Sequence, residues 1–311
     1  MMQPLAGRAV VIAGPTASGK SQLASALAER LGGVIINADS MQVYRDLSVL
    51  TARPPQGELA RLPHALYGFV SGQEAYSAGR YGRDAAAAIA AARRAGRVPI
   101  IVGGTGLYLR ALLQGLSPVP SADPAVRAHW RQQAGQRPAR ELHALLAARD
   151  PIMAARLKPS DPQRIVRALE VLDSTGRSLA DWQRQPGRPG LAASEAIPLL
   201  VLPPPASHGA AISRRFQRML ADGALEEVRR LLALGLSAEL PIMRALGVAP
   251  LTDHLAGRQS LAAAAAAAAL ETRQYAKRQM TWFRRNMISW KTFEAKEMER
   301  TAAEILAFIE P

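Results

Sequence analysis

The segment Gly14-Pro15-Thr16-Ala17-Ser18-Gly19-Lys20-Ser21 decides the fold of this chain. It fits the eight-position phosphate-loop pattern, which ends in Gly-Lys-Ser or Gly-Lys-Thr. The apolar run Arg8–Ala13 before it predicts a strand, and the apolar spacing of Ser21–Leu31 after it predicts a helix. In that setting, backbone N–H groups and the positive end of the helix converge on an anion, so the segment predicts a diphosphate or triphosphate site.

Two side chains complete the predicted phosphate site. Lys20 is expected to neutralise phosphate charge, and Ser21 to ligate Mg²⁺. The loop does not identify the compound that carries the phosphates, and an incidental Gly-rich turn is the alternative. The sequence contains no Asn-Lys-x-Asp guanine reader, and no apolar run ends in the acidic pair of an ATPase motor. A GTPase or a motor is therefore disfavoured.

Short β-branched runs alternate with helical patterns in the first hundred residues. Strands are predicted at Val34–Ala38 and Val98–Val102, with a helix at Asp84–Ala95 between them. The Gly-rich turn at 103–106 then leads into another helix. This alternation is typical of a doubly wound α/β fold, a P-loop-type parallel sheet with flanking helices.

The β signal disappears between about Gly115 and Gly190, where helical patterns are punctuated by proline. It returns at Ala196–Leu202, and everything after Pro203-Pro204-Pro205 is predicted to be helical, including a long helix that reaches about Ser289. We therefore predict a P-loop α/β core with C-terminal helices, formed by residues 1–114 and 191–311, and an inserted all-helical subdomain at 115–190. A length of 311 residues suits two domains.

The composition favours a polyanionic partner. The chain has 39 Lys and Arg against 25 Asp and Glu, a net charge of +14. A high-GC genome, whose codons favour Arg and Ala, would produce the same bias. Charge alone therefore leaves open whether the chain has a polyanionic partner or only a codon bias. The absence of cysteine excludes disulfides and thiolate zinc sites. No leader is visible and the alanine run at 262–269 is too short for a bilayer, so we expect a cytoplasmic protein.

Asp39 is the best candidate for a general base. It follows a predicted parallel strand, so its carboxylate is expected in the ligand crevice beside the phosphate loop. The alternative is an aspartate that caps the next turn. Gly103-Gly104-Thr105-Gly106 follows another strand and would face the same crevice, although a Gly-Gly turn is more often a tight connection than a site.

Basic residues concentrate in two stretches. Residues 123–188 hold twelve Arg and Lys against seven Asp and Glu, and Gln163, Arg164 and Arg167 share a face of one helix while Ile165, Val166 and Leu169 can face inward. Between 261 and 289 only Glu271 opposes Arg273, Lys277, Arg278, Arg284 and Arg285. We expect contacts with a phosphate backbone, the alternative being simple solubility. For the pair Arg214-Arg215, the residues alone do not distinguish a functional site from an exposed helix face.

Five blocks of sequence carry a resemblance to a known family: Gly14–Ser21, Asp39-Ser40-Met41-Gln42-Val43-Tyr44, Val102–Tyr108, Asp161–Glu170 and Thr272–Phe283. In this order they resemble the bacterial tRNA dimethylallyltransferases, or tRNA isopentenyltransferases, over nearly the whole chain. The sequence departs from the family pattern at Ala65-Leu66-Tyr67 and at residues 244–249.

The resemblance implies transfer of a dimethylallyl group from dimethylallyl diphosphate to N6 of the adenosine on the 3′ side of the anticodon, position 37 of tRNA. The phosphate loop would hold the diphosphate with Mg²⁺, and Asp39 would be the base. Arg215 would stabilise the leaving group, and Thr16 and Thr105 would hydrogen-bond near the reacting ends.

The target base would be flipped out of the anticodon stem-loop, because a stacked base cannot reach a buried site. The implied tRNA contacts are Asp39, Ser40, Met41, Gln42, Thr105, Arg127, Gln163, Arg164, Ile165, Val166, Arg167, Arg273, Lys277 and Arg278. A monomer is the default. Two other readings stay open from the residues alone, an ATP-dependent small-molecule kinase and a non-catalytic RNA-binding protein.

Overall fold

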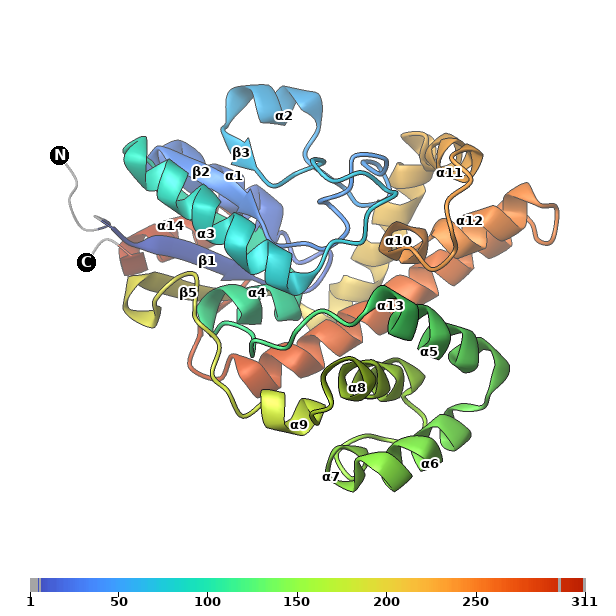
Figure 1. Cartoon of the computed structure of the whole chain (residues 1–311). Helices are drawn as coiled ribbons and strands as arrows, with labels where there is room; N and C mark the ends of the chain where they lie inside the picture. Colours follow the sequence, from blue (N-terminus) through green and yellow to red (C-terminus); the bar gives the residue numbers. More distant parts are fainter. Residues whose placement is uncertain (1–4, 6, 296–297, 310–311) are drawn as a thin grey trace. The chain divides into compact units, whose positions relative to one another are not determined.

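The computed structural model describes residues 5, 7–295 and 298–309, and the chain divides into two compact units (Figure 1). Unit 1 consists of Met1–Leu113 and Gly190–Pro311, and unit 2 of Gln114–Pro189. The predicted insertion, 115–190, differs from unit 2 by one residue at each end.

A six-stranded sheet forms the centre of unit 1. Its strands are β1 (Ala9–Ala13), β2 (Gly33–Asn37), β3 (His64–Ala65), β4 (Val98–Gly103), β5 (Ala196–Leu202) and β6 (Lys291–Glu294). They lie in the order β3-β2-β4-β1-β5-β6, and every pairing is parallel. The central strand β1 pairs Val10 with Ile100 of β4 and with Ile197 of β5. The predicted class, a parallel α/β sheet with flanking helices, is confirmed.

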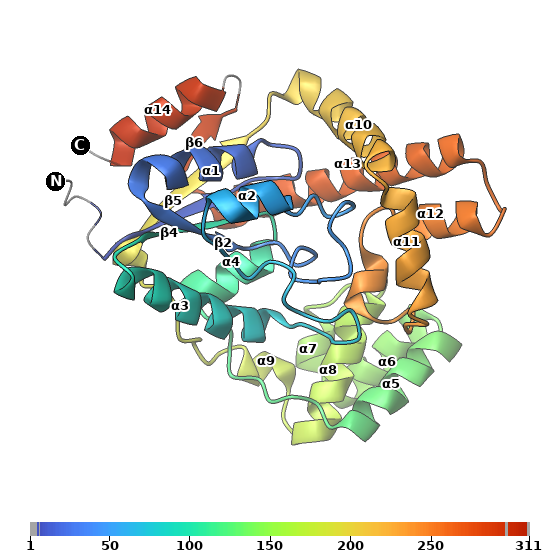
Figure 2. The ribbon, with the colours of Figure 1, turned by 90° about the horizontal axis from the view of Figure 1, so that it is seen from above.

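Helices cover both faces of this sheet. Val10 and Ile12 of β1 pack with α1 and α14, whereas Val11 points into a second cluster that includes Tyr81 of α3 and Phe283 of α13. Figure 2 shows α1 and α14 on one side of the sheet and α3 on the other. The helices of unit 1 are α1 (Lys20–Leu31), α2 (Gln56–Arg61), α3 (Ala78–Arg94), α4 (Gly106–Leu113), α10 (Pro205–Ala221), α11 (Ala224–Ala233), α12 (Val248–Leu255), α13 (Leu261–Asn286) and α14 (Met298–Ile309), with 3₁₀ turns at Ala193–Glu195 and Pro241–Arg244.

The strand order brings three loops to one edge of the sheet. β1, β2 and β4 are neighbours and run in the same direction, so their carboxyl ends lie together. Residues 14–19, 38–42 and 104–105 follow these strands directly. Ligands of open parallel sheets bind in the crevice beyond this edge, and the candidate site is therefore found there.

Unit 2 is entirely helical among its described residues: α5 (Pro124–Gln136), α6 (Ala139–Arg149), α7 (Pro151–Ala154), α8 (Pro162–Thr175) and α9 (Leu179–Trp182). Asp161 caps α8 as its spacing predicts, because its Oδ1 accepts from the Arg164 backbone N–H at 3.2 Å and Pro162 occupies the first turn. Ile165 and Leu169 are fully buried in a core of their own. Across the part of the chain that the structure describes, no helix combines the length and apolar character needed to cross a bilayer.

The last strand corrects the sequence prediction. Residues after Pro205 were expected to be helical throughout, but Lys291–Glu294 form β6 and pair with β5. Only Phe293 of these four residues is buried, so a short edge strand left no alternating apolar pattern to detect. The helix predicted from Asp84 begins earlier, at Ala78, where the Ser77 Oγ accepts from the Arg80 N–H at 3.1 Å.

Candidate active site

The phosphate loop has the backbone that its glycines permit. Ala17 and Gly19 have positive φ angles of 58° and 81°. A Cβ on Gly14 would lie 2.5 Å from the Val201 carbonyl oxygen and 2.7 Å from the Ser18 Oγ, so glycine is required there. Ser18 is buried, and its hydroxyl has no hydrogen-bond partner among the described residues. The loop therefore contains an unpaired polar group suited to a polar ligand.

Lys20 is folded back over this loop. Its Nζ donates to the Pro15 carbonyl oxygen at 3.1 Å. Burial lowers the pKa of Lys20 to about 8, while the negative charge of Asp39 acts to raise this pKa and the positive charge of Arg215 to lower it further. The structure thus places Lys20 beside the loop and within the field of both residues. Ser21, the predicted metal ligand, is exposed in the first turn of α1.

Thr16 is held by three side chains from distant parts of unit 1. Its Oγ1 accepts from Arg215 Nη1 at 3.0 Å, and its backbone N–H donates to Gln279 Oε1 at 2.9 Å. Its carbonyl oxygen lies 2.9 Å from His208 Nε2. The predicted pair Thr16 and Arg215 is therefore in direct contact. Sequence patterns did not point to His208, whereas Gln279 lies in the 272–283 block without having been singled out.

Arg215 is distinguished from its neighbour by its surroundings. Arg214 is exposed on α10, whereas burial lowers the pKa of Arg215 and the charge of Asp39 acts in the opposite direction. A half-buried guanidinium is stabilised by hydrogen-bond acceptors and negative charge, and here Thr16 accepts its hydrogen bond while the Asp39 carboxylate acts on it electrostatically. Of the two adjacent arginines, Arg215 belongs to the phosphate-loop edge.

Asp39 begins a turn that its own side chain stabilises. Its backbone N–H donates to Asn37 Oδ1 at 2.8 Å, and Asn37 Nδ2 donates to the Asp39 carbonyl oxygen at 2.9 Å. Its Oδ1 accepts from the Met41 N–H at 2.9 Å, which is the turn-capping arrangement considered as the alternative to a base. The carboxylate that caps this turn also acts electrostatically on Lys20 and Arg215, so capping does not remove Asp39 from the phosphate-loop edge.

Thr105 joins this turn to the end of β4. Its Oγ1 accepts from the Ser40 N–H at 2.9 Å and lies 3.3 Å from the Ser40 Oγ. A Cβ on Gly103 would lie 2.1 Å from the Ala38 carbonyl oxygen, so the close approach of the two loops depends on glycine. The Gly103–Gly106 turn, weak evidence in the sequence, is thus packed against the Asp39 turn.

Three tyrosines to which the sequence analysis assigns no role, Tyr67, Tyr108 and Tyr275, lie within the electrostatic field of Asp39. Burial is the main cause that raises the pKa of each, and the negative charge of Asp39 raises it further, after Tyr44 in the case of Tyr108. All three hydroxyls therefore stay protonated near neutral pH. Tyr67 lies in the segment Ala65-Leu66-Tyr67, one of the two segments that depart from the family pattern. No periodicity marks these residues, because they come from different parts of the chain.

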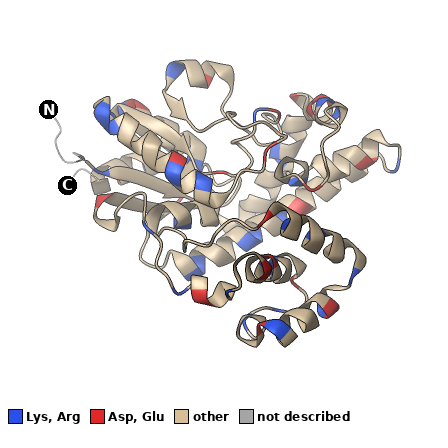
Figure 3. Ribbon diagram, in the orientation of Figure 1, with Lys and Arg blue, Asp and Glu red and all other residues tan. Residues whose placement is uncertain are grey.

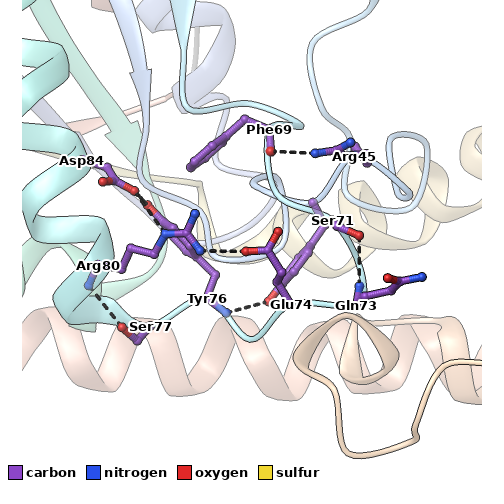
Figure 4. A network of polar contacts seen from close by, with 10 residues as sticks. Arg45, Phe69, Ser71, Gln73, Glu74, Tyr76, Ser77, Arg80 and Asp84 are labelled. Carbon is purple, nitrogen blue, oxygen red and sulfur yellow. Dashed lines mark hydrogen bonds and ion pairs between the residues drawn. The ribbon is translucent and has the colours of Figure 1, made fainter. Parts of the chain in front are cut away.

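Figure 4 shows a polar network around Tyr76. The Tyr76 hydroxyl donates to Asp84 Oδ2 at 2.7 Å, and Arg80 pairs with Glu74 at 3.0 Å while its guanidinium lies 4.9 Å from the Tyr76 ring centre. Tyr76 meets Tyr108 edge to face with ring centres 6.2 Å apart. The network thus holds Tyr76, whose ring packs against Tyr108.

The side chain of Gln42 stabilises a turn within unit 1. Its Nε2 donates to the carbonyl oxygens of Thr51 and Ala52, at 2.9 and 3.0 Å. The same turn is held by Glu227, a buried carboxylate of α11 that accepts from the N–H groups of Ser48, Val49 and Leu50 and from the Ser48 hydroxyl, at 2.6 to 2.9 Å. Gln42 was expected to contact tRNA, and in this structure its amide group stabilises the chain after Asp39.

The basic residues of α13 remain at the surface. Arg273, Lys277 and Arg278 are exposed, with the Arg278 guanidinium 5.8 Å from the Tyr275 ring centre. Arg273 Nη1 lies 3.4 Å from the Ser213 Oγ of α10.

In unit 2 the predicted RNA-binding residues divide into exposed and buried groups. Arg164 is 75% exposed and pairs with Asp161 at 3.3 Å, whereas Arg167 is 37% exposed and pairs with Glu170 at 3.5 Å. Figure 3 shows positive and negative residues along the same helices of this unit. Gln163 is exposed and Arg127 half-buried, but Ile165 and Val166 are buried in the core. Any contribution of Ile165 and Val166 to RNA binding is therefore through the helix that they hold in place.

Together, the fold and this edge define a P-loop α/β protein whose anion cradle lies beside a carboxylate. Residues 42–286 match the family described as IPP transferase, and residues 7–66 match the family described as isopentenyl transferase. The chain therefore belongs to the IPP transferase family.

Named relatives cover almost the whole chain. The tRNA dimethylallyltransferase of Parvibaculum lavamentivorans is 51% identical over 310 residues, covering 100% of this chain and 98% of that protein. The tRNA dimethylallyltransferase of Azorhizobium caulinodans is 52% identical over 289 residues, covering 93% of this chain and 92% of that protein.

Solved structures show the same fold. The tRNA isopentenylpyrophosphate transferase of Bacillus halodurans matches with a TM-score of 0.68 and 30% identity, covering 97% of this chain and 95% of that one. A eukaryotic dimethylallyltransferase acting on tRNA matches with a TM-score of 0.79 and 27% identity, covering 96% of this chain and 77% of that one.

Proposed function

We infer that this chain transfers the dimethylallyl group of dimethylallyl diphosphate to N6 of the adenosine next to the anticodon of tRNA, on its 3′ side, and releases diphosphate. Its family and its relatives support this reaction. The observation that carries the chemistry is the convergence of Lys20 and Arg215 on the edge that holds Asp39. The two cations that would stabilise the departing diphosphate thus lie at the same edge as the carboxylate that would accept the amine proton.

The phosphate loop binds the diphosphate of the donor in this proposal. Residues Ala17 to Ser21 supply backbone N–H groups, because Pro15 has none and the Thr16 N–H is bound to Gln279. Lys20 supplies a charge, and the unpaired Ser18 hydroxyl supplies a polar contact inside the loop. Arg215 reaches the loop through Thr16. Fixed positive groups stabilise the charge that builds up on the departing diphosphate, because they need no reorganisation as the bond breaks.

The site also suits Mg²⁺. Hydroxyl and phosphate oxygens are the ligands that this ion prefers, and the exposed Ser21 hydroxyl stands at the start of α1, directly after the loop. A bound Mg²⁺ would neutralise part of the diphosphate charge.

Asp39 acts as the general base. The exocyclic amine of adenine is a weak nucleophile because its lone pair is delocalised, so removing a proton while the N–C bond forms lowers the barrier. The new bond joins N6 to the first carbon of the dimethylallyl group, the C–O bond to the diphosphate breaks, and the amine proton passes to the carboxylate. Thr105 keeps the Asp39 turn in place through its bond to the Ser40 N–H.

The acceptor adenosine enters unstacked from the anticodon loop. We propose that two groups of residues, each within its own unit, bind the tRNA backbone. In unit 1 these are Arg273, Lys277 and Arg278 of α13, and in unit 2 they are Arg164 and Arg167 of α8 together with Arg127 and Gln163. A cytoplasmic monomer is the proposed working form.

The function is tested by label transfer. Purified protein is incubated with Mg²⁺, labelled dimethylallyl diphosphate and unmodified tRNA, and in parallel with labelled ATP and the same tRNA. We expect label in tRNA in the first reaction only. Phosphate transfer from ATP would favour the kinase reading, and tRNA binding without transfer of either label would favour a non-catalytic RNA-binding protein.

A further inference from the structure

Gln279 of α13 connects two loops that lie far from it in sequence. Its Oε1 accepts from the Thr16 N–H at 2.9 Å, and its Nε2 donates to the Gly104 carbonyl oxygen at 2.8 Å. The side chain is 6% exposed. One carboxamide thus satisfies a donor of the phosphate loop and an acceptor of the turn that carries Thr105.

The space around this carboxamide is closed. A Cβ on Gly104 would lie 2.3 Å from the Gln279 Nε2 and 3.1 Å from the Gly14 carbonyl oxygen. Glycine at this position is therefore what lets the amide reach the turn. Tyr275, one helical turn before Gln279, interacts through its hydroxyl with both Gln279 and Thr105.

These contacts form a continuous chain from the diphosphate cradle to the base. Gln279 holds Thr16 on one side and Gly104 on the other, and the next residue, Thr105, holds the Ser40 N–H beside Asp39. Buried hydrogen-bond networks that are fully satisfied are rigid. Gln279 of α13 consequently fixes the distance between the dimethylallyl diphosphate in the phosphate loop and the Asp39 carboxylate.

We propose that Gln279 is a positioning residue that sets the phosphate loop relative to the Asp39 turn, so that the reacting carbon of the donor meets the adenine amine in line. This inference rests on the proposed function. Gln279 itself touches no reacting atom in this account. Its removal should therefore slow the chemical step far more than it weakens either substrate's binding.

The test replaces Gln279 by Met, which keeps the length of the side chain and removes both hydrogen bonds. We expect kcat to fall about 10- to 100-fold, because small misplacements of reacting groups have effects of this size. The KM values for dimethylallyl diphosphate and tRNA should change about threefold or less. Gln274→Met, at an exposed position of the same helix, is the matched control and should keep kcat.

Gly104→Ala provides a second route to the same defect. The added methyl group would displace the carboxamide, so we expect a similar loss of kcat. If both changes act through this connection, the double variant Gly104→Ala with Gln279→Met should lose about threefold or less beyond the worse single variant. Fully multiplicative losses would overturn the proposal.

Amide hydrogen exchange separates this inference from the proposed function, since it needs no activity. In Gln279→Met, peptides that contain residues 14–18 and 103–106 should exchange faster than in the wild type, and in Gln274→Met they should not. Unchanged exchange, or a lowered melting temperature with unchanged kcat, would overturn the positioning role. Faster exchange in a protein whose wild type transfers no label would uphold the connection between the loops and refute the proposed reaction.

Discussion

Lys20 and Arg215 at the phosphate-loop edge differ from the exposed Arg164 of unit 2 in how the protein holds them. Lys20 and Arg215 are bound to Pro15 and Thr16, and burial lowers the pKa of each. The Arg164 side chain is 75% exposed, and its ion-pair partner among the described residues is Asp161, the N-cap of α8. The first two cations are bound to the loop, whereas Arg164 extends into solvent.

This difference matches two kinds of anion. A cation in a dry, ordered site acts strongly on charge that develops at one point, as on a leaving diphosphate. Exposed cations are screened by salt and suit a long phosphate backbone, where register matters less than total charge. In the proposed function, one chain thus uses the same residue types for chemistry in one region and for substrate capture in another.

The largest effect is expected at Asp39. Asp39→Ala and Asp39→Asn should both lower kcat by roughly 10² to 10⁴-fold, because neither side chain can accept the amine proton. Asparagine keeps an oxygen for the Met41 N–H, so this pair of variants separates the base from the turn cap. Steady-state kinetics with tRNA affinity measured in parallel checks this. Near-normal activity of Asp39→Asn would reduce Asp39 to a capping residue.

Raising the pH should weaken diphosphate binding at the phosphate loop. The pKa of Lys20 is lowered to about 8, so the ammonium is present below this pH and is lost above it. Between pH 7 and 9 the affinity for inorganic pyrophosphate should fall by up to about tenfold. Calorimetry over this range measures it, with Lys20→Met as the control that should bind weakly and show a flat profile. A wild-type profile as flat as that of Lys20→Met would remove Lys20 from the site.

Removing one exposed arginine of unit 2 should weaken tRNA binding severalfold. Arg164→Ala is expected to lower the slope of log K against log salt by about one, because one phosphate contact is lost. Arg300 is a matched control, since it is also 75% exposed and pairs with Glu304 at 3.1 Å. Filter binding at several salt concentrations gives both slopes. Equal slopes for Arg164→Ala and the wild type would move the RNA contact away from α8.

The smallest effect on activity is expected at Glu227. Glu227→Gln leaves the four donors around residues 48–50 with a weaker acceptor, and should lower the free energy of unfolding by about 1–3 kcal/mol. Chemical denaturation measures this change, and kcat well below the melting temperature should stay within about twofold of the wild type. A large fall in kcat without loss of stability would place this turn in the reaction instead.

Local pattern explains what the sequence could predict. The phosphate loop, the strands around β1 and the Asp161 cap of α8 each depend on neighbours within a few residues, and the parallel sheet follows from their alternation. The strand β6 escaped because it is short and mostly exposed.

The other features that escaped depend on distance along the chain. Gln279 meets Thr16 across 263 residues, and the tyrosines around Asp39 come from three separate segments. The residues alone left the Arg214-Arg215 pair open, and the family resemblance selected Arg215. Packing agrees with this choice, because Arg214 is exposed whereas Arg215 is half-buried and donates to Thr16.

The central claim is that the phosphate loop holds a prenyl diphosphate and not ATP. A crystal structure of the protein with equal concentrations of ATP and a non-reacting thio-analogue of dimethylallyl diphosphate tests it most directly. The account predicts the analogue in the loop, with its phosphates against Lys20 and residues 14–21 and its reacting carbon toward Asp39. ATP in that loop, with the prenyl compound elsewhere or absent, would contradict it.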